Sequence, residues 1–179
     1  MYRSSVLRRV TLFIACSLDN YIARADGAID WLFTEGDYGY KEFYDSIDTV
    51  LMGRKTYETS KKLGESSSGK TCYVFSRSER DSEAGNVQFA SDPVNLTRRL
   101  VFEQGKGIFV EGGGEIVSAL LNEDLIDEIV LSIHSILLGS GVPLFVHFKK
   151  QVDLKLLKSV AHGNGLVQSY YRVLKVSRL

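Results

Sequence analysis

The chain has 179 residues, of which 44% are hydrophobic and 25% are charged, and its 22 Lys and Arg residues balance 22 Asp and Glu residues. Such a composition is typical of a globular protein, and the length predicts a single domain over residues 1–179. The formal net charge of zero argues against a general DNA- or RNA-binding protein, which usually carries an excess of basic residues. We therefore expect no nucleic-acid partner.

The spacing of the cysteines and histidines and the length of the apolar runs exclude further classes of protein. Cys16 and Cys72 form no CxxC pair and are expected to be inert core thiols, and the three histidines are too scattered for a structural zinc site, so no metal is predicted. No apolar run approaches the roughly 20 residues of a membrane-spanning helix. Residues 1–9 carry three arginines and resemble a short arm more than a signal peptide. We expect a cytoplasmic protein without a membrane partner.

Strand-like and helix-like segments alternate along the chain. In chain order the patterns predict a strand at 10–16, a loop-rich segment at 19–31, a helix at 40–46, a strand at 49–52, a helix at 56–63, a strand at 71–75, a helix at 93–104, a strand at 108–110, a helix at 115–122 and strands at 129–134, 152–161 and 166–176. Asp92 and Pro93 are typical of a helix start, and residues 162–165 have hairpin chemistry. This order predicts an α/β fold with a mixed, mostly parallel central sheet and a C-terminal antiparallel hairpin.

In such sheets ligands bind beyond the carboxyl ends of the strands, and three turns there carry suitable residues. In the first turn, Gly53 ends a predicted buried strand and Thr56 opens a predicted helix. Arg54 and Lys55 stand between them, where they oppose the helix dipole unless an anion is bound there. The turn therefore predicts a phosphate site. A solvated basic turn, with Thr56 as an ordinary N-cap, is the alternative.

The second turn follows the strand at 71–75 and contains Ser76, Arg77 and Ser78. Two hydroxyl groups and a guanidinium suit a phosphate monoester, although an ordinary polar loop would have the same composition. The third turn, Glu111 to Glu115, contains three consecutive glycines, which let backbone N–H groups approach a ligand closely. Together the turns predict a dinucleotide with a ribose 2′-phosphate, which favours NADPH over NADH.

Six segments resemble a known family. They are SLDNYIA (17–23), DW (30–31), MGRKTYE (52–58), FSRS (75–78), VEGGGEIVSALL (110–121) and LLGSGVPLF (137–145). Their combination resembles the dihydrofolate-reductase-like superfamily. Within it the chain is most similar to the group of the C-terminal reductase domain of the bifunctional riboflavin-biosynthesis deaminase-reductase. The resemblance covers about residues 10–174.

This resemblance implies a dihydrofolate-reductase-like three-layer α/β fold, NADPH bound across the central sheet, and a homodimer. Carried over motif by motif, it places two apolar residues against the nicotinamide and the three turns around the phosphates and riboses. Together with the residues of the second turn, the cofactor-binding candidates are Ala15, Ile22, Gly53, Arg54, Lys55, Thr56, Ser76, Arg77, Ser78, Gly112, Gly113, Gly114, Glu115 and Ile116.

The catalytic carboxylate departs from the family pattern. Dihydrofolate reductases place an acid a few residues beyond a tryptophan, but here Gly36 stands in register beyond Trp31, with Glu35 and Asp37 on either side. Asp30 is a further candidate, although it could equally be a turn residue. The ring of Trp31 could form a wall of the substrate site or simply close the core.

The resemblance implies an NADPH-dependent reductase that transfers a hydride to a pyrimidine- or pteridine-type small molecule, as 5-amino-6-(5-phosphoribosylamino)uracil reductase does. A water molecule or one of Asp30, Glu35 and Asp37 would supply the proton. Two alternatives remain open: a true dihydrofolate reductase, and a protein that binds NADPH without turnover.

Overall fold

A computed structural model describes residues 7–64, 69–77 and 85–175. Most of the predicted N-terminal arm and of the Ser-rich loop at 64–69, and Ser78 of the second turn, therefore lie outside the described residues. The helices are α1 (Tyr40–Asp45), α2 (Arg54–Lys62), α3 (Pro93–Leu100) and α4 (Gly114–Asn122). The strands are β1 (Val10–Ser17), β2 (Tyr21–Ala23), β3 (Ile47–Gly53), β4 (Thr71–Phe75), β5 (Val87–Ala90), β6 (Gly107–Gly112), β7 (Glu128–His134), β8 (Val142–Pro143), β9 (Asp153–Ala161) and β10 (Val167–Leu174).

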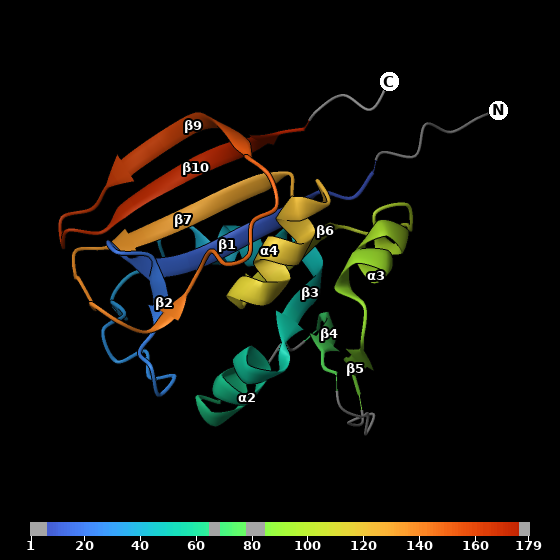
Figure 1. Ribbon diagram of the computed structural model, residues 1–179, viewed down its shortest axis with the longest axis horizontal. Coiled ribbons are helices and arrows are strands. Elements are labelled where there is room, and N and C mark those ends of the chain that lie inside the picture. The colour runs from blue at the N-terminus through green and yellow to red at the C-terminus, as the bar shows by residue number, and fades with distance from the viewer. Residues whose placement is uncertain (1–6, 65–68, 78–84, 176–179) are drawn as a thin grey trace.

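One eight-stranded sheet organises the molecule, in the order β5-β4-β3-β6-β1-β7-β10-β9 (Figure 1). The first six strands of this order are parallel, whereas β10 runs antiparallel to both β7 and β9. The predicted mixed sheet with a C-terminal antiparallel hairpin is therefore confirmed. A second, two-stranded sheet joins β2 to β8 and ties the loop after β1 to the loop after β7.

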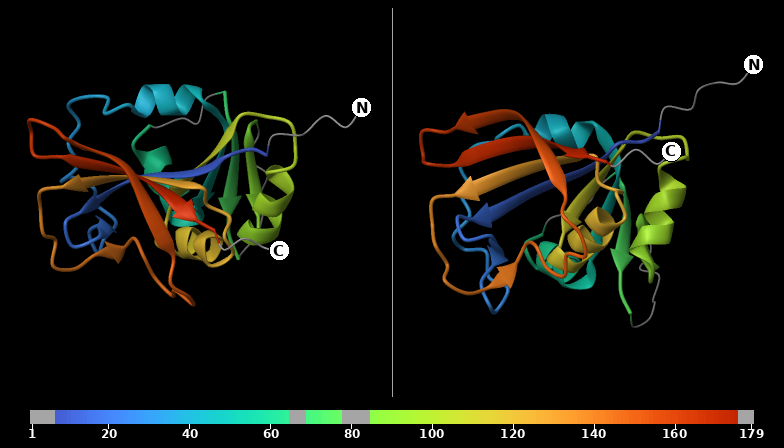
Figure 2. Two further views of the ribbon diagram at one scale, coloured as in Figure 1. Left: turned by 90° about the horizontal axis from the view of Figure 1, so that it is seen from above. Right: turned by 45° about the horizontal axis from the view of Figure 1, so that its top comes forward.

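Helices cover both faces of the sheet and make three layers, with α1 and α4 on opposite sides (Figure 2). On the face that we call the α4 face, apolar residues of β1, β6 and β7 form the larger core cluster with α3 and α4. On the opposite face, here the α1 face, Phe13 stacks on Phe43 of α1 with ring centroids 4.9 Å apart, and Tyr57 of α2 packs against the smaller core cluster. Strand β1 is apolar at nearly every position because both of its faces are covered.

The structure corrects several predicted boundaries. Helix α2 begins at Arg54, two residues before the predicted start, so Thr56 lies inside the first turn and is not its N-cap. Helix α3 ends at Leu100 instead of residue 104, whereas its predicted N-cap is confirmed because Asp92 accepts a hydrogen bond from Asn95 N. Strands β2, β5 and β8 were not predicted, because strands of two to four residues are too short for a periodic pattern.

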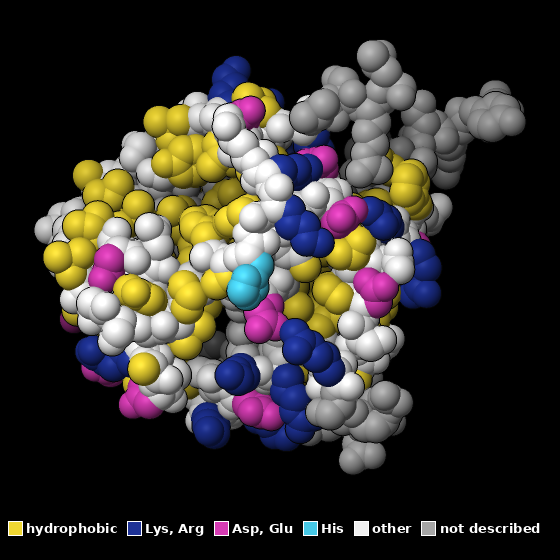
Figure 3. Space-filling model, viewed as in Figure 1, with side chains coloured by type: hydrophobic (Ala, Val, Ile, Leu, Met, Phe, Trp, Pro, Cys, Tyr) yellow, Lys and Arg dark blue, Asp and Glu magenta, His cyan; other side chains and the backbone are white. Residues whose placement is uncertain are grey.

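The C-terminal hairpin leaves one sheet surface uncovered. Strand β9 lies at the edge of the sheet and most of its residues are exposed. Leu154 and Leu156 on β9 share the α4 face with Val167 on β10, as the register of the two strands requires. Figure 3 shows hydrophobic side chains gathered over the region where Figure 1 places β7, β9 and β10.

Candidate functional site

The three turns singled out in the sequence follow neighbouring strands. Gly53 at the end of β3 is paired with Phe75 at the end of β4, and Met52 of β3 is paired with Gly112 at the end of β6. Because these strands are parallel, their carboxyl ends meet at one edge of the sheet (Figure 1). The segments that begin at Gly53, Ser76 and Gly112 are therefore brought together, as the sequence predicted.

The glycines at the end of β6 form the centre of this edge. Gly112 has φ +132°, a region that favours glycine, and the Gly112–Gly113 peptide bond is cis. A Cβ atom at Gly112 would lie 3.4 Å from Cδ1 of Ile14, and one at Gly113 would lie 3.7 Å from Oγ1 of Thr56 and 3.8 Å from Cδ1 of Ile22. Bare backbone is thus surrounded by residues from β1, β2 and α2, which include the predicted Ile22 and Thr56.

The start of α2 adds N–H groups and positive charge to this edge. Helix α2 follows Gly53 directly, and no side chain caps its first N–H groups. Arg54 Nε donates to Oε1 of Glu58 at 2.8 Å, which directs this guanidinium along the helix surface. Lys55 is exposed on the same turn, and its ammonium group has no ion-pair partner within the described ranges. The uncapped N–H groups and Lys55 can together hold a phosphate.

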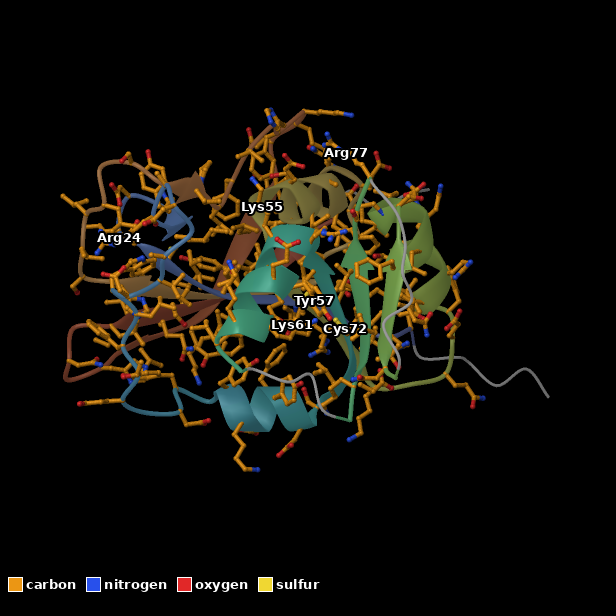
Figure 4. The ribbon with its side chains drawn as sticks, turned by 90° about the horizontal axis from the view of Figure 1, so that it is seen from below. Arg24, Lys55, Tyr57, Lys61, Cys72 and Arg77 are labelled. Carbon is orange, nitrogen blue, oxygen red and sulfur yellow. The ribbon has the colours of Figure 1, made fainter. Side chains whose placement is uncertain are left out.

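The turn after β4 carries the second cation. Ser76 N donates to the carbonyl oxygen of Ala90, and Arg77, whose side chain is 92% exposed, lies 3.2 Å from Oε2 of Glu115 at the start of α4. Both partners of this ion pair are exposed to solvent, so the pair is weak and a phosphate can displace it. Figure 4 shows Lys55 and Arg77 on the segments that follow β3 and β4.

Ala15 marks an uncovered area on the α1 face, beside the glycine edge. It lies two residues beyond Phe13 on β1, so both side chains point to this face. Both are partly exposed, although β1 is an interior strand between β6 and β7. The area can therefore accept a flat ring.

Glu111, the first residue of the third turn, is a carboxylate of this face that was not among the predicted site residues. Phe109, two residues earlier on β6, packs edge-to-face on Phe43 of α1, so Glu111 points to the same face. Its Oε1 accepts a hydrogen bond of 3.0 Å from Ser60 Oγ of α2. The alternation of side-chain direction along β6 indicates which face Glu111 points to. In this segment, however, only residues 112–116 were predicted to bind a ligand.

Trp31 reaches the α1 face through His134 of β7. The indole is only 8% exposed, and its ring lies edge-on to the His134 imidazole with centroids 5.2 Å apart. Its buried Nε1 has no hydrogen-bond partner among the residues that the structure describes. His134 Nε2 accepts from Phe33 N at 3.1 Å, and burial lowers the pKa of His134, so this histidine is neutral and structural.

The three predicted acids lie on the loop between β2 and α1. Asp30 forms a two-pronged ion pair with Arg24, and its Oδ1 lies 2.6 Å from Arg24 Nε. Asp37 accepts from Lys41 N at 2.9 Å and so holds the start of α1. Glu35 is exposed to solvent on the same loop. Asp30 thus connects two parts of the loop, and Asp37 connects the loop to α1.

Three further observations concern Cys16, metal ligands and membrane-spanning helices. Burial raises the pKa of the Cys16 thiol to about 12, so this cysteine is inert at neutral pH. Among the residues that the structure describes, no group of three or more His, Cys, Asp and Glu could hold a metal ion. None of the described helices has the length and apolarity needed to cross a membrane.

Comparisons with known proteins agree with the fold and the motifs. The family model of the RibD C-terminal domain matches residues 8–168. The chain is 40% identical over 171 residues to the uncharacterized protein YwjB of Bacillus subtilis (strain 168), a match that covers 92% of this chain and 98% of that protein.

Two solved structures are also similar. A Shewanella sp. PV-4 protein assigned to riboflavin biosynthesis superposes with a TM-score of 0.82 at 28% identity, over 93% of this chain and 99% of that one. Dihydrofolate reductase from Enterococcus faecalis, solved with NADP(H), has a TM-score of 0.71 at 15% identity, over 93% and 97% of the two chains. The predicted dihydrofolate-reductase-like fold is therefore confirmed. Because the family model covers most of the chain, the protein belongs to the RibD C-terminal domain family.

Proposed function

We propose that the protein is an NADPH-dependent reductase that transfers a hydride to a pyrimidine-type heterocycle related to 5-amino-6-(5-phosphoribosylamino)uracil. The observation that carries this proposal is the convergence of the three turns that begin at Gly53, Ser76 and Gly112 on one sheet edge. The RibD family membership and the Shewanella structure assigned to riboflavin biosynthesis support the reaction class.

The residues at this edge fit NADPH. The bare backbone of Gly112 and Gly113 allows a pyrophosphate to approach closely, and the start of α2 offers N–H groups and the Lys55 ammonium. Arg77 follows β4, which is the neighbour of β3 in the sheet, and its exposed guanidinium would bind the ribose 2′-phosphate. The known complex of the Enterococcus dihydrofolate reductase with NADP(H) supports the same choice of cofactor.

In the proposed reaction, residues of this chain bind and orient the cofactor and the substrate and exclude water. When bound, NADPH supplies the hydride from its nicotinamide ring. Ala15 and Ile22 would contact that ring, and the uncovered area beside Ala15 would admit the electrophilic carbon of the substrate. Trp31 covers the substrate and excludes water, and its buried Nε1–H is available to a substrate acceptor atom.

The proton is proposed to come from a carboxyl group or a water molecule at this face. Glu111 lies on the same sheet face as Ala15, where its Oε1 accepts a hydrogen bond from Ser60 Oγ, whereas Asp30 and Asp37 make loop contacts and Glu35 is exposed to solvent. Replacing each of the four by its amide and measuring turnover separates them. We expect Glu111→Gln to lower kcat most. Wild-type rates in all four variants would exclude these carboxylates as the proton donor.

The same geometry favours a pyrimidine over dihydrofolate. A folate substrate needs an acid beyond the tryptophan that accepts hydrogen bonds from the pterin ring, yet Gly36 stands in register there, Asp37 accepts from Lys41 N and Glu35 is exposed to solvent. NADPH oxidation should be measured with a ribosylaminouracil and with dihydrofolate, beside a binding titration without substrate. Turnover of the uracil alone supports the proposal, and turnover of dihydrofolate alone overturns it. Binding without any turnover would show a non-catalytic NADPH-binding protein.

We also propose a homodimer that buries the uncovered α4 face of the C-terminal hairpin. Leu156 is 55% exposed on the edge strand β9. On the same side, a hollow of about 590 Å³ is lined by Leu18, Ile133, Leu137 and Val167, among others. A two-fold axis would bring this apolar surface against its own copy and cover the edge strand.

A further inference from the structure

Three polar side chains, two of them buried and one partly buried, form a hydrogen-bonded row on the α1 face of β7 and β10. Tyr170 Oη donates to Oε1 of Gln168 at 2.7 Å, and Gln168 Nε2 donates to Oγ of Ser132 at 3.1 Å. Gln168 is 1% exposed and Ser132 is 6% exposed. Buried polar groups in the middle of a sheet face are costly unless they are satisfied, so this row calls for an explanation.

The donors of this row all point in one direction. Tyr170 donates to Gln168 and Gln168 donates to Ser132, so the Ser132 hydroxyl group accepts and keeps its own hydrogen for another acceptor. Within the part of the chain that the structure describes, no acceptor for this hydrogen is found. Each hydrogen bond in such a chain polarises the next, which makes the final hydroxyl a better donor.

Ser132 lies beside the position proposed for the nicotinamide and its substrate. It is paired with Ala15 across the β1–β7 ladder, and both side chains therefore point to the α1 face. His134, two residues further along β7 and roughly 7 Å away, contacts Trp31, whose buried Nε1–H also lacks an acceptor. The face thus offers two unused donors, from different elements.

We propose that the Ser132 hydroxyl group, positioned and polarised by Gln168 and Tyr170, donates a hydrogen bond to a ring carbonyl oxygen of the substrate and determines specificity for oxo-pyrimidines. Ser132 touches the substrate, whereas Gln168 and Tyr170 are positioning residues that act through it. This inference rests on the proposed function, because it assumes a heterocycle stacked beside Ala15. A ring without the carbonyl group leaves the buried donor unpaired, and such mismatches are strongly disfavoured.

The test compares two probe ligands in the presence of NADP⁺, so that no turnover occurs. Calorimetry measures the affinity for 5,6-diaminouracil and for 4,5-diaminopyrimidine, which lacks both ring carbonyl groups. We expect the wild type to prefer the uracil and Ser132→Ala to weaken uracil binding about tenfold without changing the binding of the pyrimidine. Ser132→Thr keeps the donor on a residue suited to strands and should restore the preference.

Tyr170→Phe removes only the distal hydroxyl group and should weaken uracil binding about threefold, again without affecting the pyrimidine. Equal losses for both ligands in Ser132→Ala, or unchanged uracil affinity with an unchanged melting temperature, would overturn the inference and leave the proposed function intact. If the wild type binds NADP⁺ but neither ring, both proposals fail. NADPH affinity is measured for every variant and should remain that of the wild type.

Discussion

Ala15 of β1 lies directly opposite Ser132 of β7 in the parallel register of the sheet. This pair joins two parts of the molecule with different chemistry. On one side of Ala15 are the bare glycines and cations of the strand ends, and on the other are the buried hydroxyl and amide groups of β7 and β10. A ring stacked over Ala15 would therefore meet the cofactor edge and the donor row at the same time.

Arg77→Ala should weaken NADPH binding roughly 10- to 100-fold and change NADH binding little, because only NADPH carries a 2′-phosphate for the guanidinium. Fluorescence titration of the single tryptophan measures both affinities. Glu115→Gln is the matched variant: it frees Arg77 from its 3.2 Å ion pair and should strengthen NADPH binding. Equal losses for both cofactors would exclude this role for Arg77.

Gly113→Ala and Gly114→Ala should separate cofactor binding from stability. A Cβ at Gly113 meets only Thr56 and Ile22 at ordinary contact distances, so this variant should fold normally but bind NADPH at least tenfold more weakly, by roughly 1.4 kcal/mol or more. At Gly114 the added atom would lie 2.5 Å from the carbonyl oxygen of Pro143.

This overlap should lower the free energy of unfolding of Gly114→Ala by about 1–3 kcal/mol. Thermal melts of both variants measure their stability, and NADPH titrations measure their cofactor affinity. Wild-type NADPH affinity in Gly113→Ala would show that the glycine surface does not contact the cofactor.

The stability of the protein should fall as the pH decreases through about 6.5. Burial lowers the pKa of His134 from its ordinary value of 6.5, so the folded protein binds this proton less readily than the unfolded chain. The contribution of the neutral histidine is complete above pH 6.5 and is lost between that value and the lower pKa of the folded state.

Urea unfolding across this pH range measures the free energy of unfolding. In His134→Gln this free energy should depend less steeply on pH. The lowered pKa values of Asp19 and Asp30 act below their ordinary value of 3.8 and do not interfere. A slope that is the same in the variant would assign the pH dependence to other groups.

Leu156→Lys should convert the proposed dimer to a monomer, because it places a charge on the uncovered apolar face. Light scattering over a range of concentrations gives the mass. Lys155→Gln alters the neighbouring residue, which points to the opposite face of β9, and should leave the dimer intact. A wild-type protein that is monomeric at every concentration would contradict the proposal.

The amino-acid sequence by itself determined the succession of strands and helices, since apolar periodicity and helix-start residues such as Asp92 are local signals. It also located the three strand-end turns, because parallel strands bring their carboxyl ends to one edge whatever their order. Only the tertiary structure decided that Ala15 faces Ser132 and that Gln168 completes the donor row, because sheet register depends on contacts between distant segments. The tertiary structure likewise decided that Asp30 pairs with Arg24 and that Glu111 accepts a hydrogen bond from Ser60. These contacts depend on packing between segments, which no local sequence pattern contains.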